Sequence, residues 1–150
     1  MYPYQDPTIN SGGLNGTRIA VVPALDPDCS SDSTSTVPAL TTFSIRQRDA
    51  LDFTVDFSAW LSANSGGMLS AAVFALAVGS PGTPVIASQG FNPSGACVVV
   101  LRPAATAKPG DAYWLDITAN IAAIAATVNN PVALPQRTLT RRINFVVVAG

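Results

Sequence analysis

Strict alternation of apolar and polar side chains between residues 51 and 57 constrains the fold more than any other feature of this chain. Apolar side chains occupy every second position from Leu51 to Phe57, and Asp52, Thr54 and Asp56 lie between them. Successive side chains of a strand point to opposite faces of its sheet, so this period of two predicts a strand that is buried on one side only.

The same period recurs from residue 41 onward, with turn residues between the alternating segments. Gly79-Ser80-Pro81-Gly82 and Lys108-Pro109-Gly110-Asp111 are two such turns. The segment 119–126 fits either an extension of a strand or a helical turn. The pattern predicts an all-β protein, an antiparallel β-sandwich of seven or eight strands. The predicted strands span residues 17–22, 41–48, 51–57, 68–78, 84–88, 97–101, 113–118 and 137–148.

Residues 1–40 differ from the rest of the chain. They contain five prolines, a Gly-Gly pair and a run of serines and threonines, a composition that favours extended backbone and loops. We therefore divide the chain into an extended N-terminal arm, 1–40, and a sandwich domain, 41–150. An ordered arm must lie on its own domain or on a neighbouring subunit.

The composition argues against catalysis. The chain has no histidine and no glutamate, and Lys108 is its only lysine. Histidine is the commonest general base, so serine triads and activated thiols are excluded. Asp52 and Asp56 lie four residues apart on one strand, about 13 Å at about 3.3 Å per residue, too far for a pair of glycosidase carboxylates. We predict a protein that is not an enzyme, with no cofactor and no metal; the aspartates at 26, 28 and 32 fit turns better than a calcium site.

Net charge and hydropathy restrict the partners and the compartment. The formal charge is −1 with no basic run, so binding to nucleic acid through phosphates is not expected. The longest apolar run, 71–78, is far shorter than the roughly 20 residues that span a bilayer, and residues 1–6 do not resemble a secretory signal. We therefore expect a soluble protein made in the cytoplasm. Cys29 and Cys97 are expected to be free thiols there, with one disulfide between them as the alternative.

Arginines and one tryptophan are the candidate interface residues. Arg46 and Arg48 are expected to share a strand face, while Arg137, Arg141 and Arg142 mark the last predicted strand. Arginine pairs well with carboxylates at protein interfaces, although a polar face that keeps the domain soluble explains the same residues. Alternation places Trp114 on the outer face, where an indole would mark a contact surface, and Trp60 in the core. The predicted interface set is Arg18, Arg46, Arg48, Trp114, Arg137 and Arg142.

Two motifs carry a resemblance to a known family. The stretch Asp52-Phe53-Thr54-Val55-Asp56-Phe57-Ser58-Ala59-Trp60-Leu61 resembles the opening strands of immunoglobulin-like domains in structural proteins of tailed bacteriophages. The stretch Lys108-Pro109-Gly110-Asp111-Ala112-Tyr113-Trp114-Leu115 is similar to the turn and following strand of immunoglobulin and fibronectin-like sandwiches, where the tyrosine packs at a corner between the sheets. The resemblance covers about residues 41–149, although the long segment 119–135 replaces the usual hairpin before the last strand.

The resemblance implies an immunoglobulin-like sandwich attached to a virion. The expected function is that of a capsid decoration or cement protein, which binds the major capsid protein on the outer head surface and stabilises the shell. A symmetric homo-oligomer fits this role. The alternative is an adhesin or carbohydrate-binding module on the tail or baseplate, which would use exposed aromatic side chains to bind a cell-surface glycan.

Overall fold

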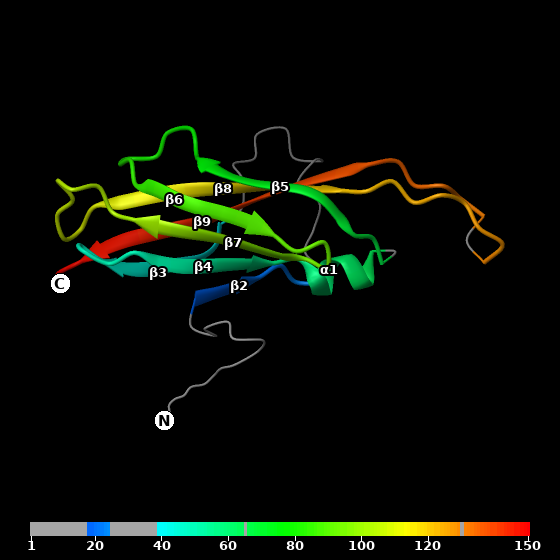
Figure 1. The fold of residues 1–150 in the computed structure, drawn as a ribbon, viewed down its shortest axis with the longest axis horizontal. Helices are drawn as coiled ribbons and strands as arrows, with labels where there is room; N and C mark the ends of the chain where they lie inside the picture. The colour runs from blue at the N-terminus through cyan, green and yellow to red at the C-terminus, as the bar shows by residue number, and fades with distance from the viewer. Residues whose placement is uncertain (1–17, 25–38, 65, 130) are drawn as a thin grey trace, which may run out of the picture.

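The computed structural model describes residues 18–24, 39–64, 66–129 and 131–150. Two four-stranded sheets pack face to face, and one short helix, α1 (Ser58–Ala63), lies at one end of them (Figure 1). The first sheet has the order β2 (Ile19–Val21), β4 (Leu51–Asp56), β7 (Ala96–Arg102), β6 (Val85–Phe91). The second has the order β3 (Ala39–Arg46), β9 (Arg137–Val148), β8 (Ala112–Ile121), β5 (Leu69–Leu76). The prediction of a β-sandwich with seven or eight strands is therefore confirmed.

The sheets are mixed rather than purely antiparallel. Strand β2 runs parallel to β4, and β3 runs parallel to β9, whereas the other four pairings are antiparallel. Neither parallel pair is joined by a hairpin, because β3 intervenes between β2 and β4 and most of the chain separates β3 from β9. The orders β4-β7-β6 and β9-β8-β5 are those of strands B, E, D and G, F, C in an immunoglobulin sandwich.

The alternation in the sequence produces the core. Phe53, Val55 and Phe57 are completely buried, as their spacing predicted. Between the sheets the ring of Phe53 lies 5.0 Å from that of Phe43 and 4.7 Å from that of Phe145, in an edge-to-face contact with the latter. Three aromatic rings from three strands thus join the two sheets at their centre.

Tyr113 fastens a loop to this core. Its ring is buried at the start of β8, and its hydroxyl oxygen accepts a hydrogen bond of 3.3 Å from the backbone N–H of Ala104. Ala104 belongs to the loop between β7 and β8, so the tyrosine holds this loop against the end of the sandwich. This is the corner position that the resemblance implied.

The helix α1 was not anticipated from the sequence. It follows Phe57 directly, and the carboxylate of Asp56 accepts a hydrogen bond of 2.9 Å from the N–H of Ser58 in its first turn. The helix buries Trp60 and Leu61, which confirms the prediction that Trp60 is a core residue.

Part of the predicted arm belongs to the sandwich. The strand predicted at 17–22 is present as β2, and the side chains of Ala20 and Val22 are buried in the core cluster. The second sheet begins at Ala39, within the predicted arm. The rest of that prediction, 1–17 and 25–38, falls outside the described residues.

A side chain covers the free edge of β5. The amide of Gln89 on β6 accepts a hydrogen bond of 2.7 Å from the N–H of Phe74 and donates one of 3.2 Å to its carbonyl oxygen. These are the bonds that an added strand would make at this position. Exposed edges are usually protected by charge, but no residue from 57 to 101 is charged, and the Gln89 amide takes over that task.

Candidate interaction surfaces

Arg142 and Trp114 interact with each other on the outer face of the second sheet. Asp116 lies opposite Arg142 in the β8–β9 register, and its two carboxylate oxygens accept hydrogen bonds of 2.8 and 3.3 Å from the guanidinium. The hydrogen bond to Asp116 raises the pKa of Arg142. The same guanidinium lies 5.5 Å from the centroid of the Trp114 ring. Trp114 is on the outer face, as predicted, but it is half-buried.

Arg137 lies five positions away on β9 and therefore on the other face, in different surroundings. Its guanidinium lies 5.7 Å from the centroid of the Trp60 ring, and Nη1 donates a hydrogen bond of 3.0 Å to the carbonyl of Asn64. Nε and Nη2 are buried without a hydrogen-bond partner. Arg141, which directly precedes Arg142, is buried, and its Nη1 donates a hydrogen bond of 2.8 Å to the carbonyl of Thr140. The arginines of the last strand thus do not form one surface.

Arg18 also binds within the chain. Its Nη2 forms an ion pair of 3.0 Å with the carboxylate of Asp52, and its Nε donates a hydrogen bond of 2.8 Å to the carbonyl of the same residue. These contacts join the beginning of β2 to β4. The Arg18 guanidinium therefore binds within the fold and is a poor candidate for contact with a partner.

Four exposed cations without such partners surround one end of the sandwich. Strand β3 ends at Arg46 and Arg48 lies in the following turn, so the prediction that the two share a strand face is wrong. Arg102 ends β7, and Lys108 lies in the loop that follows. Within the part of the chain that the structure describes, none of these four side chains forms an ion pair. We refer to Arg46, Arg48, Arg102 and Lys108 as the arginine end.

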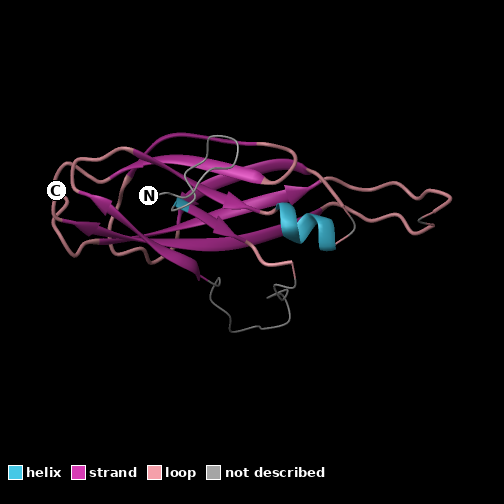
Figure 2. Cartoon of the chain, turned by 90° about the horizontal axis from the view of Figure 1, so that it is seen from below, coloured by secondary structure: helices cyan, strands magenta, loops and turns pink. Residues whose placement is uncertain are grey.

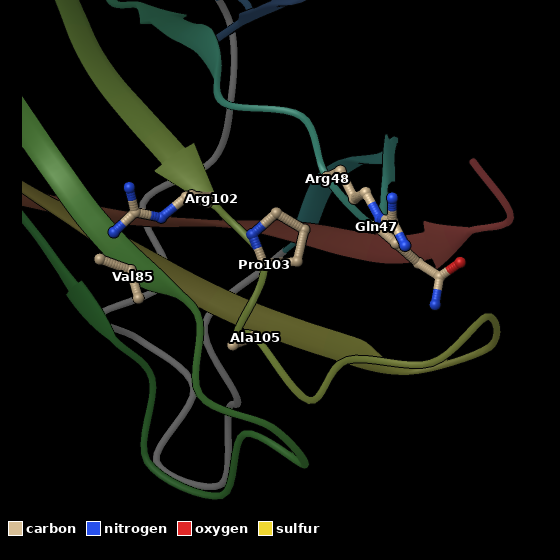
Figure 3. A pocket seen from close by; sticks show the side chains of 6 residues that line it. All are labelled: Gln47, Arg48, Val85, Arg102, Pro103 and Ala105. Carbon is tan, nitrogen blue, oxygen red and sulfur yellow. The ribbon is translucent and has the colours of Figure 1, made fainter.

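An open hollow of about 380 Å³ lies between two of these cations. Val85 and the buried Pro103 contribute apolar surface, and Arg48 and Arg102 lie on opposite sides of Pro103 (Figure 3). Gln47 borders the hollow and donates a hydrogen bond of 3.0 Å from Nε2 to the carbonyl of Ala107. Because the two guanidinium groups do not converge on one point, the hollow fits a broad acidic surface better than a single small anion.

Residues 122–129 and 131–136, which we call the finger, project from the opposite end of the sandwich (Figures 1 and 2). The finger connects β8 to β9, and Ile124 and Leu134 exchange two backbone hydrogen bonds of 2.9 and 2.8 Å across it. Nearer the tip, Val128 is 99% exposed and Val132 63% exposed. The finger contains no charged residue. No predicted interface residue lies in it, although the uncharged run from 117 to 136 was visible in the sequence.

A second hollow, of about 410 Å³, lies at the base of the finger. Its lining comes from both the finger and the segment before β5, and it contains no charged residue. Met68, at its border, has an exposed side chain. The lining residues are Gly66, Gly67, Met68, Ala122, Ala123, Ile124, Ala125 and Thr127.

The described residues contain few groups that could take part in catalysis or bind a metal. No cluster of three or more cysteine and aspartate side chains in this part of the chain could hold a metal ion. No helix in the same ranges is long and apolar enough to cross a membrane. Cys97 is a buried free thiol, and burial together with the charge of Asp56 raises its pKa from 9.0 to about 12. Cys29 lies outside the described residues. At neutral pH the Cys97 thiol is protonated and therefore a poor nucleophile.

Of the predicted interface residues, Arg46 and Arg48 lie exposed at the arginine end, and neither forms an ion pair within the described part of the chain. The remaining predicted interface residues, Arg18, Arg137, Arg142 and Trp114, make contacts within the chain. Comparison of the chain with protein-family models and with curated proteins finds no match.

Proposed function

We propose that this chain is a non-enzymatic structural protein of a bacteriophage particle. It is a decoration protein, made in the host cytoplasm, that binds the major capsid protein on the outer head surface and stabilises the shell. The observation that carries the proposal is the arginine end, where four exposed cations form no ion pair within the described residues and two of them, Arg48 and Arg102, line an open hollow. The resemblance of residues 52–61 to phage structural domains supplies the kind of particle.

The local charge at the arginine end supports an acidic partner. The formal charge of the whole chain is −1, but this end carries four cations against two carboxylates, those of Asp49 and Asp111. Arginine is enriched at protein interfaces, where its guanidinium binds carboxylates in a fixed geometry. Nucleic acid is a poorer fit, because the four cations are accompanied at this end by Asp49 and Asp111 and form no continuous stripe.

The other carboxylates support a structural role rather than hydrolysis. Asp52 is paired with Arg18, Asp116 with Arg142, and Asp56 accepts a hydrogen bond from the first turn of α1. Each therefore stabilises the fold where it lies. A glycosidase would need two carboxylates converging on an open cleft.

The alternative, a tail or baseplate adhesin that binds glycans, has less support. Sugars stack on flat aromatic faces, and the half-buried ring of Trp114 already has the Arg142 guanidinium over it. Among the aromatic side chains of the described residues, Phe91 at the end of β6 is the most exposed, at 39%, and a single ring offers little stacking surface. Glycan binding by a tail or baseplate adhesin therefore remains the alternative outcome of the localisation experiment described next.

The test begins with localisation on particles purified from the source organism, using antibody to the full chain. Label spread over the head is expected. Label confined to the tail would favour the adhesin, and unlabelled particles would contradict both functions.

A binding experiment then tests the arginine end. Purified chain is added to particles that lack it, and the bound fraction is compared for the unmodified chain and the variant Arg48→Ala/Arg102→Ala. The matched control, Ala59→Glu/Ser62→Glu, makes the same change in net charge on exposed residues of α1 at the other end. We expect the first variant to lose most of its binding and the control to retain it. Equal losses would mean that net charge, and not the arginine end, carries the contact.

A further inference from the structure

We propose that the contact at the arginine end continues along the free edge of β6. An extended segment of the partner adds to this edge as a further strand of the first sheet, and its carboxylates bind Arg102 and Arg48. This inference rests on the proposed function, because it concerns the same acidic partner. It adds that part of the partner binds through its backbone, as a β-strand, and not only through charges on a folded surface.

The outer side of β6 is open to such a strand. The order β2-β4-β7-β6 leaves β6 at the edge of its sheet, and within the described ranges no strand pairs with its other side. Six of its seven residues are exposed. The N–H of Asn92 bonds to the carbonyl of Ala96 at 2.7 Å, and bonded positions alternate along an antiparallel ladder. Gln89 and Phe91 therefore direct their N–H and C=O groups away from β7, toward the open side.

The other edges of the two sheets are less suited to strand addition. On β5 the backbone of Phe74 is bonded to the Gln89 amide, β2 has only three residues, and only four of the eight residues of β3 are exposed. From Val85 to Phe91, in contrast, β6 has no charge and no proline, the devices that usually protect an edge. Partners use open edges of this kind for β-augmentation, in which backbone hydrogen bonds supply the affinity.

A bulge makes this edge selective. The β6–β7 register shifts between Ile86 and Ser88, so the regular part of the edge is confined to the four residues from Ser88 to Phe91. Bulges twist an edge away from indiscriminate pairing. So short a ladder holds a strand only weakly, and a specific partner must make additional contacts beyond the bulge.

The cations of the arginine end supply those contacts where β6 begins. The register places Val85 opposite Arg102, and both line the hollow together with Arg48 and the buried Pro103 (Figure 3). An added strand lies about 4.8 Å from β6 and about 10 Å from β7, so a carboxylate on it is within reach of the extended Arg102 side chain. An apolar side chain then covers Val85 and Pro103, and a second carboxylate binds Arg48. The expected segment is therefore extended and ends in an acidic, apolar, acidic pattern.

A second copy of this chain is a poorer occupant of the edge. Pairing of two β6 strands would bring no carboxylate to Arg102, because residues 85–91 are uncharged. Each guanidinium would then lose water without gaining a counter-ion, which is unfavourable. Nucleic acids and glycans have no polypeptide backbone that could extend the sheet. An acidic polypeptide satisfies both the open backbone and the cations.

Hydrogen exchange of the full chain, free and bound to particles that lack it, tests this inference. We expect the open-side amides of residues 85–91 to exchange at least about tenfold more slowly on the particle, whereas those of α1 and of the edge strand β3 keep their rates. Binding without slower exchange in 85–91, or with protection of β3 instead, overturns the inference and leaves the proposed function standing. A chain that does not bind the particles overturns both.

Two variants at one position isolate the backbone contact. Phe91→Pro removes an N–H that faces the open side, whereas Phe91→Ala removes the same ring and keeps that N–H. Proline is tolerated on an edge strand where its N–H would face solvent, and Phe91 is not part of the core cluster, so both variants are expected to fold, as thermal unfolding would show. Phe91→Pro should bind particles about tenfold more weakly than Phe91→Ala. Equal binding by the two folded variants would mean that no strand adds at this edge.

Discussion

The two ends of the sandwich differ in almost every property that governs binding. At the arginine end, strand ends and loops present four exposed cations, two of which line a hollow, and the Tyr113 hydroxyl ties one loop to the core. At the other end a long finger exposes valines and carries no charge at all. The first surface suits contacts that are steered by charge and weakened by salt, and the second suits contacts that depend on burial of apolar area.

The comparison teaches that a β-sandwich can separate its interactions along its long axis. On the flanks between the ends, Arg18, Arg142 and Gln89 are bonded within the chain, whereas the cations of the arginine end form no ion pair among the described residues.

The largest expected effect is the response of binding at the arginine end to salt. Raising the salt concentration from about 50 mM to about 500 mM should weaken binding to particles about a hundredfold, because the Debye length falls to about 4 Å and the attraction between exposed charges is screened. Binding that remains in the variant Arg48→Ala/Arg102→Ala should depend on salt much less. Particle co-sedimentation of both proteins in the same buffers measures the two responses. Equal salt dependence would mean that the arginine end does not carry the contact.

A separate effect, on the free energy of unfolding, is expected from pH at the finger end, where Cys97 begins the buried part of β7. Its pKa is raised from 9.0 to about 12, so the folded chain keeps a proton that the unfolded chain loses above pH 9. The free energy of unfolding should therefore fall as pH rises from 9 toward 12, by up to about 1.4 kcal/mol per pH unit.

Denaturant titrations at several pH values measure this slope. The comparison is between Cys29→Ala and Cys29→Ala/Cys97→Ala, so that only the buried thiol differs. The double variant should lose that contribution to the slope. If both variants depend on pH equally, the thiol is not the group responsible.

The smallest effect is expected at the arginine end, from Tyr113→Phe. The ring stays in its buried site, but the N–H of Ala104 loses its acceptor and the loop between β7 and β8 loses its link to the core. The free energy of unfolding should decrease by about 0.5–1.5 kcal/mol, as measured by denaturant unfolding. Ser70→Ala serves as the control, because its hydrogen bond to the Asn120 carbonyl has the same length, 3.3 Å, but is exposed to water, so its loss should cost less. A larger loss from Ser70→Ala than from Tyr113→Phe would contradict this account.

The strands could be predicted because alternation is a local property. Strand β9 was expected at 137–148 and spans Arg137–Val148, and the apolar positions of β4 and β8 point inward as their spacing required. Pairing direction could not be predicted in this way. The parallel partners of β2 and β3 lie far away in the sequence, and no turn between them determines their direction.

The candidate interaction surfaces were harder to predict from sequence alternation than the strands. Because side chains alternate along a strand, the sequence alone places Arg141 on the face of Ile143 and Arg142 on the opposite face. Which aspartate binds Arg142 depends on the β8–β9 register. Arg102 was overlooked because it follows an apolar strand, although it is the first charge after residue 56. The missed helix has six residues and no side-chain cap, so its sequence carried little helical signal.

The two hydrogen bonds between the Gln89 amide and the backbone of Phe74 have a consequence for folding during synthesis. They join strands of different sheets, so they form only after the sheets have met. Before that moment a nascent chain exposes an uncharged strand edge that any neighbouring copy can occupy. Losses to aggregation would therefore arise during synthesis, at high expression and high temperature, whereas the finished molecule resists them. A chain lacking this amide could be as stable as its parent once folded and still be recovered in far smaller amounts.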